Sequence, residues 1–185
     1  MVQKVREDRP GKKVKVYWMD EGRFGQQGTL TRKWAERGSR PTAVKQTNYE
    51  WVYGYAAVDP VSGDAAALLL RHVDTEHMNE FLRVMSGTLG PDEHAVLVMD
   101  NAGWHHSKGL KMPENITPLF LPPYSPELNP IERLWAYIKS HFLSNTAHAD
   151  YQALLDAGCH AWDALTPDRL KSVCAVPWFT PGNQS

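Results

Sequence analysis

The apolar run AVLVMD at residues 95–100 ends in Asp100, and the run VKVYWMD at residues 14–20 ends in the same way in Asp20. Both runs predict buried strands. A buried strand that ends in an acid puts a charge at the rim of a sheet, where ligand sites of open α/β folds form. We therefore expect two carboxylates at one edge of a sheet.

A third acid, Glu132, stands at the start of a predicted amphipathic helix, directly after the sequence Asn129-Pro130-Ile131. Mg²⁺ prefers hard oxygen ligands and is held by a few carboxylates together with water and substrate phosphate. Three acids brought to one place by two strands and a helix therefore indicate Mg²⁺-assisted phosphoryl transfer.

The order of the predicted elements indicates an α/β fold with a ribonuclease H-like mixed sheet. Three antiparallel strands come first, two parallel strands follow, and helices cover both faces. Residues 21–31 contain three glycines and predict a loop or hairpin after the first strand. The predicted strands are 14–19, 51–58, 65–72, 95–99 and 116–121, and the predicted helices are 74–89, 130–143, 149–164 and a short one within 165–173.

Length and composition predict one domain of 14–175, preceded by a basic tail or linker at 1–13 and followed by a flexible C-terminal tail at 176–185. The tail at 1–13 fits a solvated linker or a DNA-contacting arm. The net charge of −1 is unusual for a protein that must hold DNA by itself. No apolar run approaches the length of a membrane span, so the expected location is cytoplasmic, with no membrane partner.

Two of the three acids also have a local explanation that involves no catalysis. Asp20 can form a turn at a strand end, and Glu132 stands at N3 of a helix, where a capping box or the helix dipole favours an acid. Glu127 is a second candidate for the third acid. Asn101 and His105, which follow Asp100, are accessory candidates: Asn101 to orient a carboxylate or water, His105 to reach the scissile phosphate as a donor or proton shuttle.

The stretch LPPYSPELNPIERLW at residues 121–135 resembles the third-acid signature of mariner-type DDE transposases, especially their bacterial insertion-sequence branch. The stretch WMDEGRFG at 18–25 resembles the first-acid segment, and VMDNA at 98–102 with His105 resembles the second. The similarity spans roughly residues 14–143 and includes WAERG at 34–38. It assigns the third acid to Glu132 and not to Glu127.

The resemblance implies a DNA endonuclease and strand transferase that cuts at transposon ends and joins the freed 3′-hydroxyl to target DNA. Asp20, Asp100 and Glu132 would be the catalytic residues and the ligands of two Mg²⁺ ions, for which Mn²⁺ can substitute. Asp20 would contact both ions, Asp100 one and Glu132 the other. The activity would be DNA transposition, a form of DNA recombination.

The resemblance also implies partners. DNA is expected as transposon ends and as target, and the active complex is expected to be a homo-oligomer. Family members carry helix-turn-helix modules that read the element's ends, so a separately encoded helix-turn-helix subunit is a further expected partner. Two alternatives stay open: a ribonuclease H-like nuclease acting on hybrids or junctions, and a domesticated, non-catalytic module that binds DNA or protein.

Overall fold

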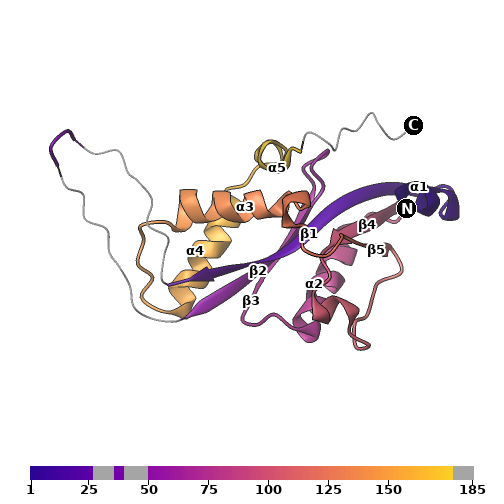
Figure 1. The fold of residues 1–185 in the computed structure, drawn as a ribbon, viewed down its shortest axis with the longest axis horizontal. Helices are drawn as coiled ribbons and strands as arrows, with labels where there is room; N and C mark the ends of the chain where they lie inside the picture. Colours follow the sequence, from indigo (N-terminus) through magenta and orange to yellow (C-terminus); the bar gives the residue numbers. More distant parts are fainter. Residues whose placement is uncertain (27–35, 40–49, 177–185) are drawn as a thin grey trace.

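A mixed five-stranded sheet with helices on both faces forms the body of the protein (Figure 1). The computed structural model describes residues 1–26, 36–39 and 50–176. The expected mixed sheet with helices on both faces is therefore confirmed. Its strands are β1 (Lys13–Gly25), β2 (Trp51–Val58), β3 (Ala65–Leu70), β4 (Glu93–Met99) and β5 (Ile116–Phe120).

Strand β1 lies at the centre of the sheet, in the order β3-β2-β1-β4-β5. It pairs antiparallel with β2 along residues 18–25 and parallel with β4 along residues 13–18, and the last parallel pair is Trp18 with Val98. Beyond that pair β4 ends while β1 continues along β2. The carboxyl end of β4 therefore lies beside the middle of β1.

Alternate residues of β1 enter the two halves of the core. Val16 and Trp18 pack on the face that is covered by α3, α4 and α5, whereas Tyr17 and Met19 pack on the face covered by α2. Figure 1 shows α3 and α4 on one side of the sheet and α2 on the other. The helices are α1 (Val2–Asp8), α2 (Thr75–Thr88), α3 (Ile131–Ile138), α4 (Tyr151–Asp163) and α5 (Pro167–Cys174).

Strand β1 is longer than predicted. The glycines after Asp20 predicted a loop or hairpin directly after residue 20, but residues 21–25 continue the strand, and Gly25 pairs with Trp51 of β2. Glycine is a weak strand former, and it is common where a bulky group approaches the backbone closely. The aromatic rings of Trp135 and Trp51 fill the space beside Gly22 and Gly25. The expectation that Asp20 ends its strand is therefore wrong: it lies inside β1, just past the last residue that pairs with β4.

The N-terminal segment also differs from the expected solvated linker, because residues 2–8 form helix α1. Val5 of this helix is only 7% exposed and belongs to the core cluster beneath α3 and α4. Val2 packs against the same cluster, so tertiary packing of its apolar face supports this short helix. The segment 177–185 and the first two residues of the WAERG motif, Trp34 and Ala35, lie outside the described residues.

Helix α2 confirms the helix predicted at 74–89, and Asp74 caps its start by accepting a hydrogen bond from the backbone N–H of His77. The helix predicted at 130–143 is divided into α3 and a π-helical turn, Lys139–Leu143. At that turn the hydroxyl groups of Ser140 and Ser144 donate to backbone carbonyls, an interaction that disturbs regular helix. Within residues 1–26, 36–39 and 50–176, every helix is too short or too polar to cross a membrane.

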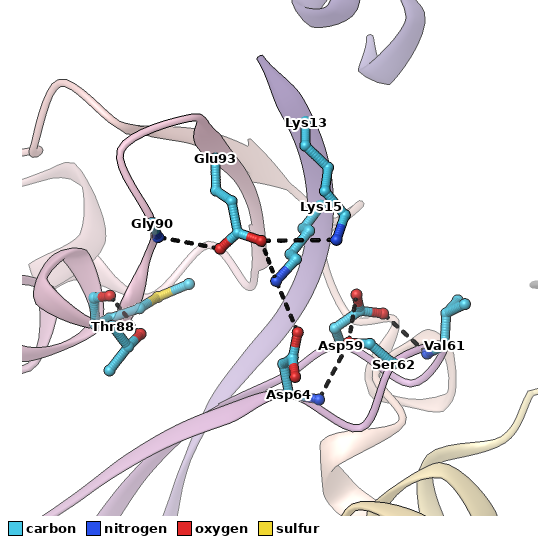
Figure 2. A network of polar contacts seen from close by, with 10 residues as sticks. Lys13, Lys15, Asp59, Val61, Ser62, Asp64, Thr88, Gly90 and Glu93 are labelled. Atoms are coloured by element: carbon cyan, nitrogen blue, oxygen red, sulfur yellow. Dashed lines mark hydrogen bonds and ion pairs between the residues drawn. The ribbon is translucent and has the colours of Figure 1, made fainter.

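A cluster of ion pairs joins β1, β4 and the turn before β3, at the end of β4 away from Asp100 (Figure 2). The ammonium group of Lys15 on β1 lies 2.8 Å from a carboxylate oxygen of Asp64 and 2.5 Å from one of Glu93. The Lys15 side chain is 12% exposed. Burial opposes its charge, but the hydrogen bonds to Asp64 and Glu93 raise the pKa of Lys15 above its usual value. This cluster fixes β1 against β4 and against the turn before β3.

Candidate functional site

The three acids singled out in the sequence line one open pocket. Asp20 enters it from β1, Asp100 from the residue after β4, and Glu132 from the first turn of α3. The pocket has a volume of about 410 Å³. Its other lining residues come from the loop after β4 and from the connector between β5 and α3: Asn101, Ala102, Leu121, Pro122, Pro123, Tyr124, Ser125, Pro126 and Asn129.

Asp20 is held by a side chain from α3. The indole nitrogen of Trp135 donates a hydrogen bond to Asp20 Oδ2 over 3.1 Å. The ring reaches this position because it lies over Gly22, where a Cβ atom would stand 2.5 Å from the ring carbon Cδ2. A glycine two residues beyond Asp20 is therefore required for the helix to dock at this point of β1.

Asp100 is held by its own loop. Its Oδ1 accepts a hydrogen bond of 2.9 Å from the backbone N–H of Ala102 and lies 3.0 Å from Nδ1 of His105. The hydrogen bond from His105 holds the pKa of Asp100 below its usual value. The Asp100 side chain is 55% exposed. It is therefore a fixed carboxylate that is ionised at neutral pH and open to solvent.

A buried network lies behind Asp100. Nε2 of His105 is 3.0 Å from Glu21 Oε1, and the indole N–H of Trp104 donates to the same oxygen over 3.0 Å. The side chains of His105 and Glu21 are 1% and 7% exposed. Burial would lower the pKa of His105, but the hydrogen bonds to Asp100 and Glu21 outweigh it and raise this pKa to about 10. His105 is thus an imidazolium between two carboxylates.

This arrangement differs from the expectation for His105. Both of its ring nitrogens are occupied by carboxylate oxygens, and the side chain is buried and does not line the pocket. It therefore contacts Asp100 from the interior of the protein, on the side away from the pocket. Asn101 does line the pocket. Its amide nitrogen donates to the carbonyl of Leu121, and its amide oxygen lies 2.9 Å from Nε2 of His106, so it braces the pocket wall.

Glu132 owes its position to Asn129. The amide nitrogen of Asn129 donates to the carbonyl of Met19 over 2.9 Å, and its amide oxygen accepts from the backbone N–H of Ile131 over 3.2 Å. The first contact ties the start of α3 to the residue before Asp20. The backbone N–H of Asn129, which a capping box would direct to Glu132, donates to the carbonyl of Pro126. The hydrogen bond from Asn129 N–H to the Glu132 side chain that defines a capping box is therefore not formed, so a capping box does not explain Glu132.

Glu127, the competing third acid, lies in a short 3₁₀ turn, Pro126–Leu128, and does not line the pocket. Glu132 is exposed and does line it. The structure thus brings together Asp20, Asp100 and Glu132, and leaves Glu127 outside the group.

Negative charge accumulates around Asp20 in the pocket. Burial raises the pKa of Asp20 to about 7, and the neighbouring negative charges of Glu132 and Glu21 act in the same direction. A buried carboxyl group whose pKa is raised further by neighbouring negative charges indicates a position where a cation would be stabilised. Within the described part of the chain, no group of three or more His, Cys, Asp or Glu side chains already has the arrangement of a metal site.

Sequence reasoning missed four residues that shape the site: Glu21, Gly22, Trp104 and Trp135. Each makes its contact with a partner far away in the sequence; Trp104 and Glu21, for example, are 83 residues apart. Two signals were present. Trp135 stands one helical turn after Glu132, where it must face the same sheet, and Glu21 directly follows Asp20 in a strand that alternates its faces.

Comparison with known proteins gives a family-model match over residues 15–155, to the family described as DDE superfamily endonuclease. A protein of Sinorhizobium fredii, described as "Uncharacterized protein y4pE/y4sA", is 42% identical over 130 residues, which cover 69% of this chain and 96% of that protein.

Solved structures of Mos1 transposase are similar in fold. The Mos1 strand transfer complex matches with a TM-score of 0.65 and 17% identity, over 86% of this chain and 50% of that one. A pre-cleavage Mos1 transpososome matches with a TM-score of 0.65 and 15% identity, over 93% and 54%. A Mos1 mariner paired-end complex with Mn matches with a TM-score of 0.63 and 16% identity, over 86% and 51%. The chain spans about half the length of these structures.

Proposed function

Because this chain belongs to the DDE superfamily endonucleases, we propose that it is the catalytic domain of a DDE transposase. Its reaction would be metal-dependent cleavage of DNA at transposon ends, followed by transfer of the freed 3′-hydroxyl to target DNA. The observation that carries this proposal is the single pocket lined by Asp20, Asp100 and Glu132. These three residues would be the catalytic acids and the metal ligands.

The donor set fits Mg²⁺, for which Mn²⁺ can substitute. Three carboxylates from separate elements offer hard oxygen ligands. Burial and, after it, the negative charges of Glu132 and Glu21 raise the pKa of Asp20, and a bound cation would offset both effects. The Mos1 complexes include one described with Mn and one with Mg. When bound, a pair of such ions supplies activation of the attacking oxygen and stabilisation of charge on the leaving 3′-oxygen.

The protein's own groups would act by position and charge. Phosphoryl transfer needs little covalent work from side chains, so holding the carboxylates in place is the main contribution of the fold. His105 keeps Asp100 ionised and oriented, with Glu21 behind it. Trp135 holds Asp20, and Asn129 fixes the start of the helix that carries Glu132.

DNA would be the substrate both as transposon ends and as target, and the protein would act in the cytoplasm. The matching Mos1 structures are described as strand transfer, paired-end and transpososome complexes. By analogy, a homo-oligomer would form the active complex. The net charge of −1 leaves little electrostatic attraction for DNA. A separately encoded helix-turn-helix subunit would supply the missing affinity and the reading of the ends.

The test is divalent-metal-dependent nicking by the full chain. Supercoiled plasmid, a linear duplex and an RNA–DNA hybrid are each incubated with the protein and Mg²⁺ or Mn²⁺, with EDTA as the control. The proposal predicts nicking of the DNA substrates that requires the metal. Cleavage of the hybrid alone would assign the site to a ribonuclease H-like nuclease. The absence of metal-dependent nicking on all three would favour a non-catalytic module.

A further inference from the structure

Tyr124 is an aromatic residue with no packing of its own. It is 101% exposed, which is unusual for a ring that can bury a large apolar area. It lies in the proline-rich connector between β5 and α3 and lines the same pocket as Asp20, Asp100 and Glu132. A ring that the protein leaves uncovered beside an acidic pocket is available to a bound molecule.

The backbone of Tyr124 is also unfavourable. Its φ angle is 58°, in the left-handed region that bulky residues rarely adopt. Strain of this kind persists only where the surrounding structure imposes it, and it concentrates at functional sites. A glycine or asparagine would fit this backbone with less strain, so neither the packing nor the local conformation explains why a tyrosine stands here.

The connector holds this conformation from both sides. On one side the backbone N–H of Leu121 donates to the carbonyl of Met99 over 2.8 Å, and the amide nitrogen of Asn101 donates to the carbonyl of Leu121. On the other side the backbone N–H of Leu128 donates to the carbonyl of Ser125 over 3.1 Å. Hydrogen bonds therefore anchor the connector on both sides of Tyr124, and the ring extends from it into solvent.

We propose that Tyr124 stacks on an unpaired DNA base adjacent to the phosphate that enters the acidic pocket. This inference rests on the proposed function, which supplies the phosphate and the strand. A base is the occupant that fits, because it is the flat, apolar part of a nucleotide and lies within one sugar of the phosphate. Stacking on tyrosine suits every base, since each has a π face.

Stacking on Tyr124 would not depend on the DNA sequence. Two amides line the pocket and could read a base edge, but both are already engaged. The Asn101 amide bonds to Leu121 and His106. The Asn129 amide bonds to Met19 and Ile131. Stacking without edge contacts predicts similar binding of purines and pyrimidines. Tyr124 would thus hold a strand that is already opened, and it would leave the choice of site to another part of the complex.

The experiment uses 2-aminopurine, a base whose fluorescence falls when it stacks on an aromatic ring. A short duplex carries 2-aminopurine opposite an abasic site, next to a nick, with Ca²⁺ in place of Mg²⁺. Wild-type protein and Tyr124→Phe are expected to quench the probe. Tyr124→Ala is expected to lose the quenching and to bind the probe about tenfold more weakly. The control is Val61→Ala, at another exposed apolar residue, outside the pocket, and it should match wild type.

Equal quenching by wild type and Tyr124→Ala overturns the inference. So does unchanged fluorescence combined with a loss of self-association in Tyr124→Ala, which would assign the ring to a protein contact. A second variant tests whether the tyrosine is structural. Tyr124→Gly relieves the strained φ angle, so its melting temperature should be equal to or above that of wild type, while quenching is lost. A marked fall in melting temperature would show that the ring packs within the fold and overturn the inference.

Failure of this inference can be distinguished from failure of the proposed function. If wild type nicks DNA with Mg²⁺ but quenching does not depend on Tyr124, the stacking is wrong and the nuclease stands. If quenching depends on Tyr124 but no metal supports nicking, the base site stands and the transposase chemistry is wrong.

Discussion

Trp135 donates its indole hydrogen to Asp20 across 3.1 Å, and this bond joins the two elements that carry the first and the third acid. Trp135 stands one turn after Glu132 on α3, so docking its ring on β1 also sets the position of Glu132. The contact depends on the bare backbone of Gly22. The site is therefore built into the packing of a helix on a strand, and changes behind the pocket should alter its activity.

Gly22→Ala should disturb that packing. The added methyl would stand 2.5 Å from Trp135 Cδ2, so the ring must move. We expect a loss of about 1–3 kcal/mol of unfolding free energy, typical of overpacking, together with loss of metal-dependent nicking. Gly87→Ala is the matched control, because no atom lies within 4 Å of its added methyl. In helix α2 it should stabilise by roughly 0.5–1 kcal/mol. Urea unfolding checks both, and equal behaviour of the two variants would contradict the packing argument.

Asp20→Asn should stabilise the metal-free protein, and the gain should depend on pH. The folded pKa of Asp20 is raised to about 7, so the folded state binds more protons than the unfolded state between about pH 4 and 7, and stability falls as pH rises through this window. Asparagine removes the free-energy cost of ionising Asp20 in the folded state, which amounts to at most about 4 kcal/mol. It also keeps an acceptor for Trp135. Melting with EDTA at pH 8 should show the gain, and at pH 4 it should have vanished. A variant less stable than wild type at pH 8 would contradict this.

Asp100→Asn should destabilise the metal-free protein, which is the opposite of the effect expected for Asp20→Asn. His105 lowers the pKa of Asp100 in the folded state, so this carboxylate contributes stability above its unfolded pKa, and the contribution is lost as pH falls through the folded pKa. The variant should therefore be less stable than wild type at pH 7, and the two should converge in acid. Thermal unfolding with EDTA at both pH values measures the difference. Stabilisation by Asp100→Asn at pH 7 would show that repulsion among the acids outweighs the bond to His105.

Lys15→Met tests the ion-pair cluster remote from the pocket. The pKa values of Asp64 and Glu93 are lowered by Lys15, so the cluster contributes stability above about pH 4 and loses it as pH falls further. Removing one partner of a charged hydrogen bond costs roughly 1.5–3 kcal/mol. We expect that loss at pH 7, a smaller difference from wild type at pH 3, and nicking unchanged below the melting temperature. A constant difference across pH would indicate lost side-chain packing in place of lost charge.

Local pattern predicted the elements whose ends are marked in the sequence. The strand at 51–58 was predicted at its observed bounds, Trp51–Val58, because an aromatic and β-branched run is followed by the turn beginning at Asp59. Helix α2 was predicted from its apolar spacing and from Asp74. Both signals lie within or next to the element, so no tertiary information was needed.

The extension of β1 could not be predicted in that way. Gly22 and Gly25 favour a loop when read locally, and they become suitable for a strand only because tryptophan rings lie over them. One of those rings, on Trp135, lies 113 residues beyond Gly22 in the sequence. The same holds for Glu21, whose burial depends on His105 and Trp104.

The family resemblance, together with the acids at the ends of apolar runs, predicted that the three acids would meet. The pocket that all three line agrees with this prediction. Their catalytic roles stay a prediction. The choice between Glu132 and Glu127 could not be made from local physics, because both are exposed acids near the start of α3. Only Glu132 lines the pocket.

The central test compares metal-dependent nicking by Glu132→Gln and Glu127→Gln at a temperature where both variants are folded. It shows which of the two glutamates is the third metal ligand. Glutamine keeps the size of the side chain and removes its charge. The pocket geometry predicts that Glu132→Gln loses most nicking with Mg²⁺ or Mn²⁺, as do Asp20→Asn and Asp100→Asn, while Glu127→Gln stays near wild type. Nicking retained by Glu132→Gln, or lost in Glu127→Gln alone, would contradict the assignment of this pocket as the catalytic site.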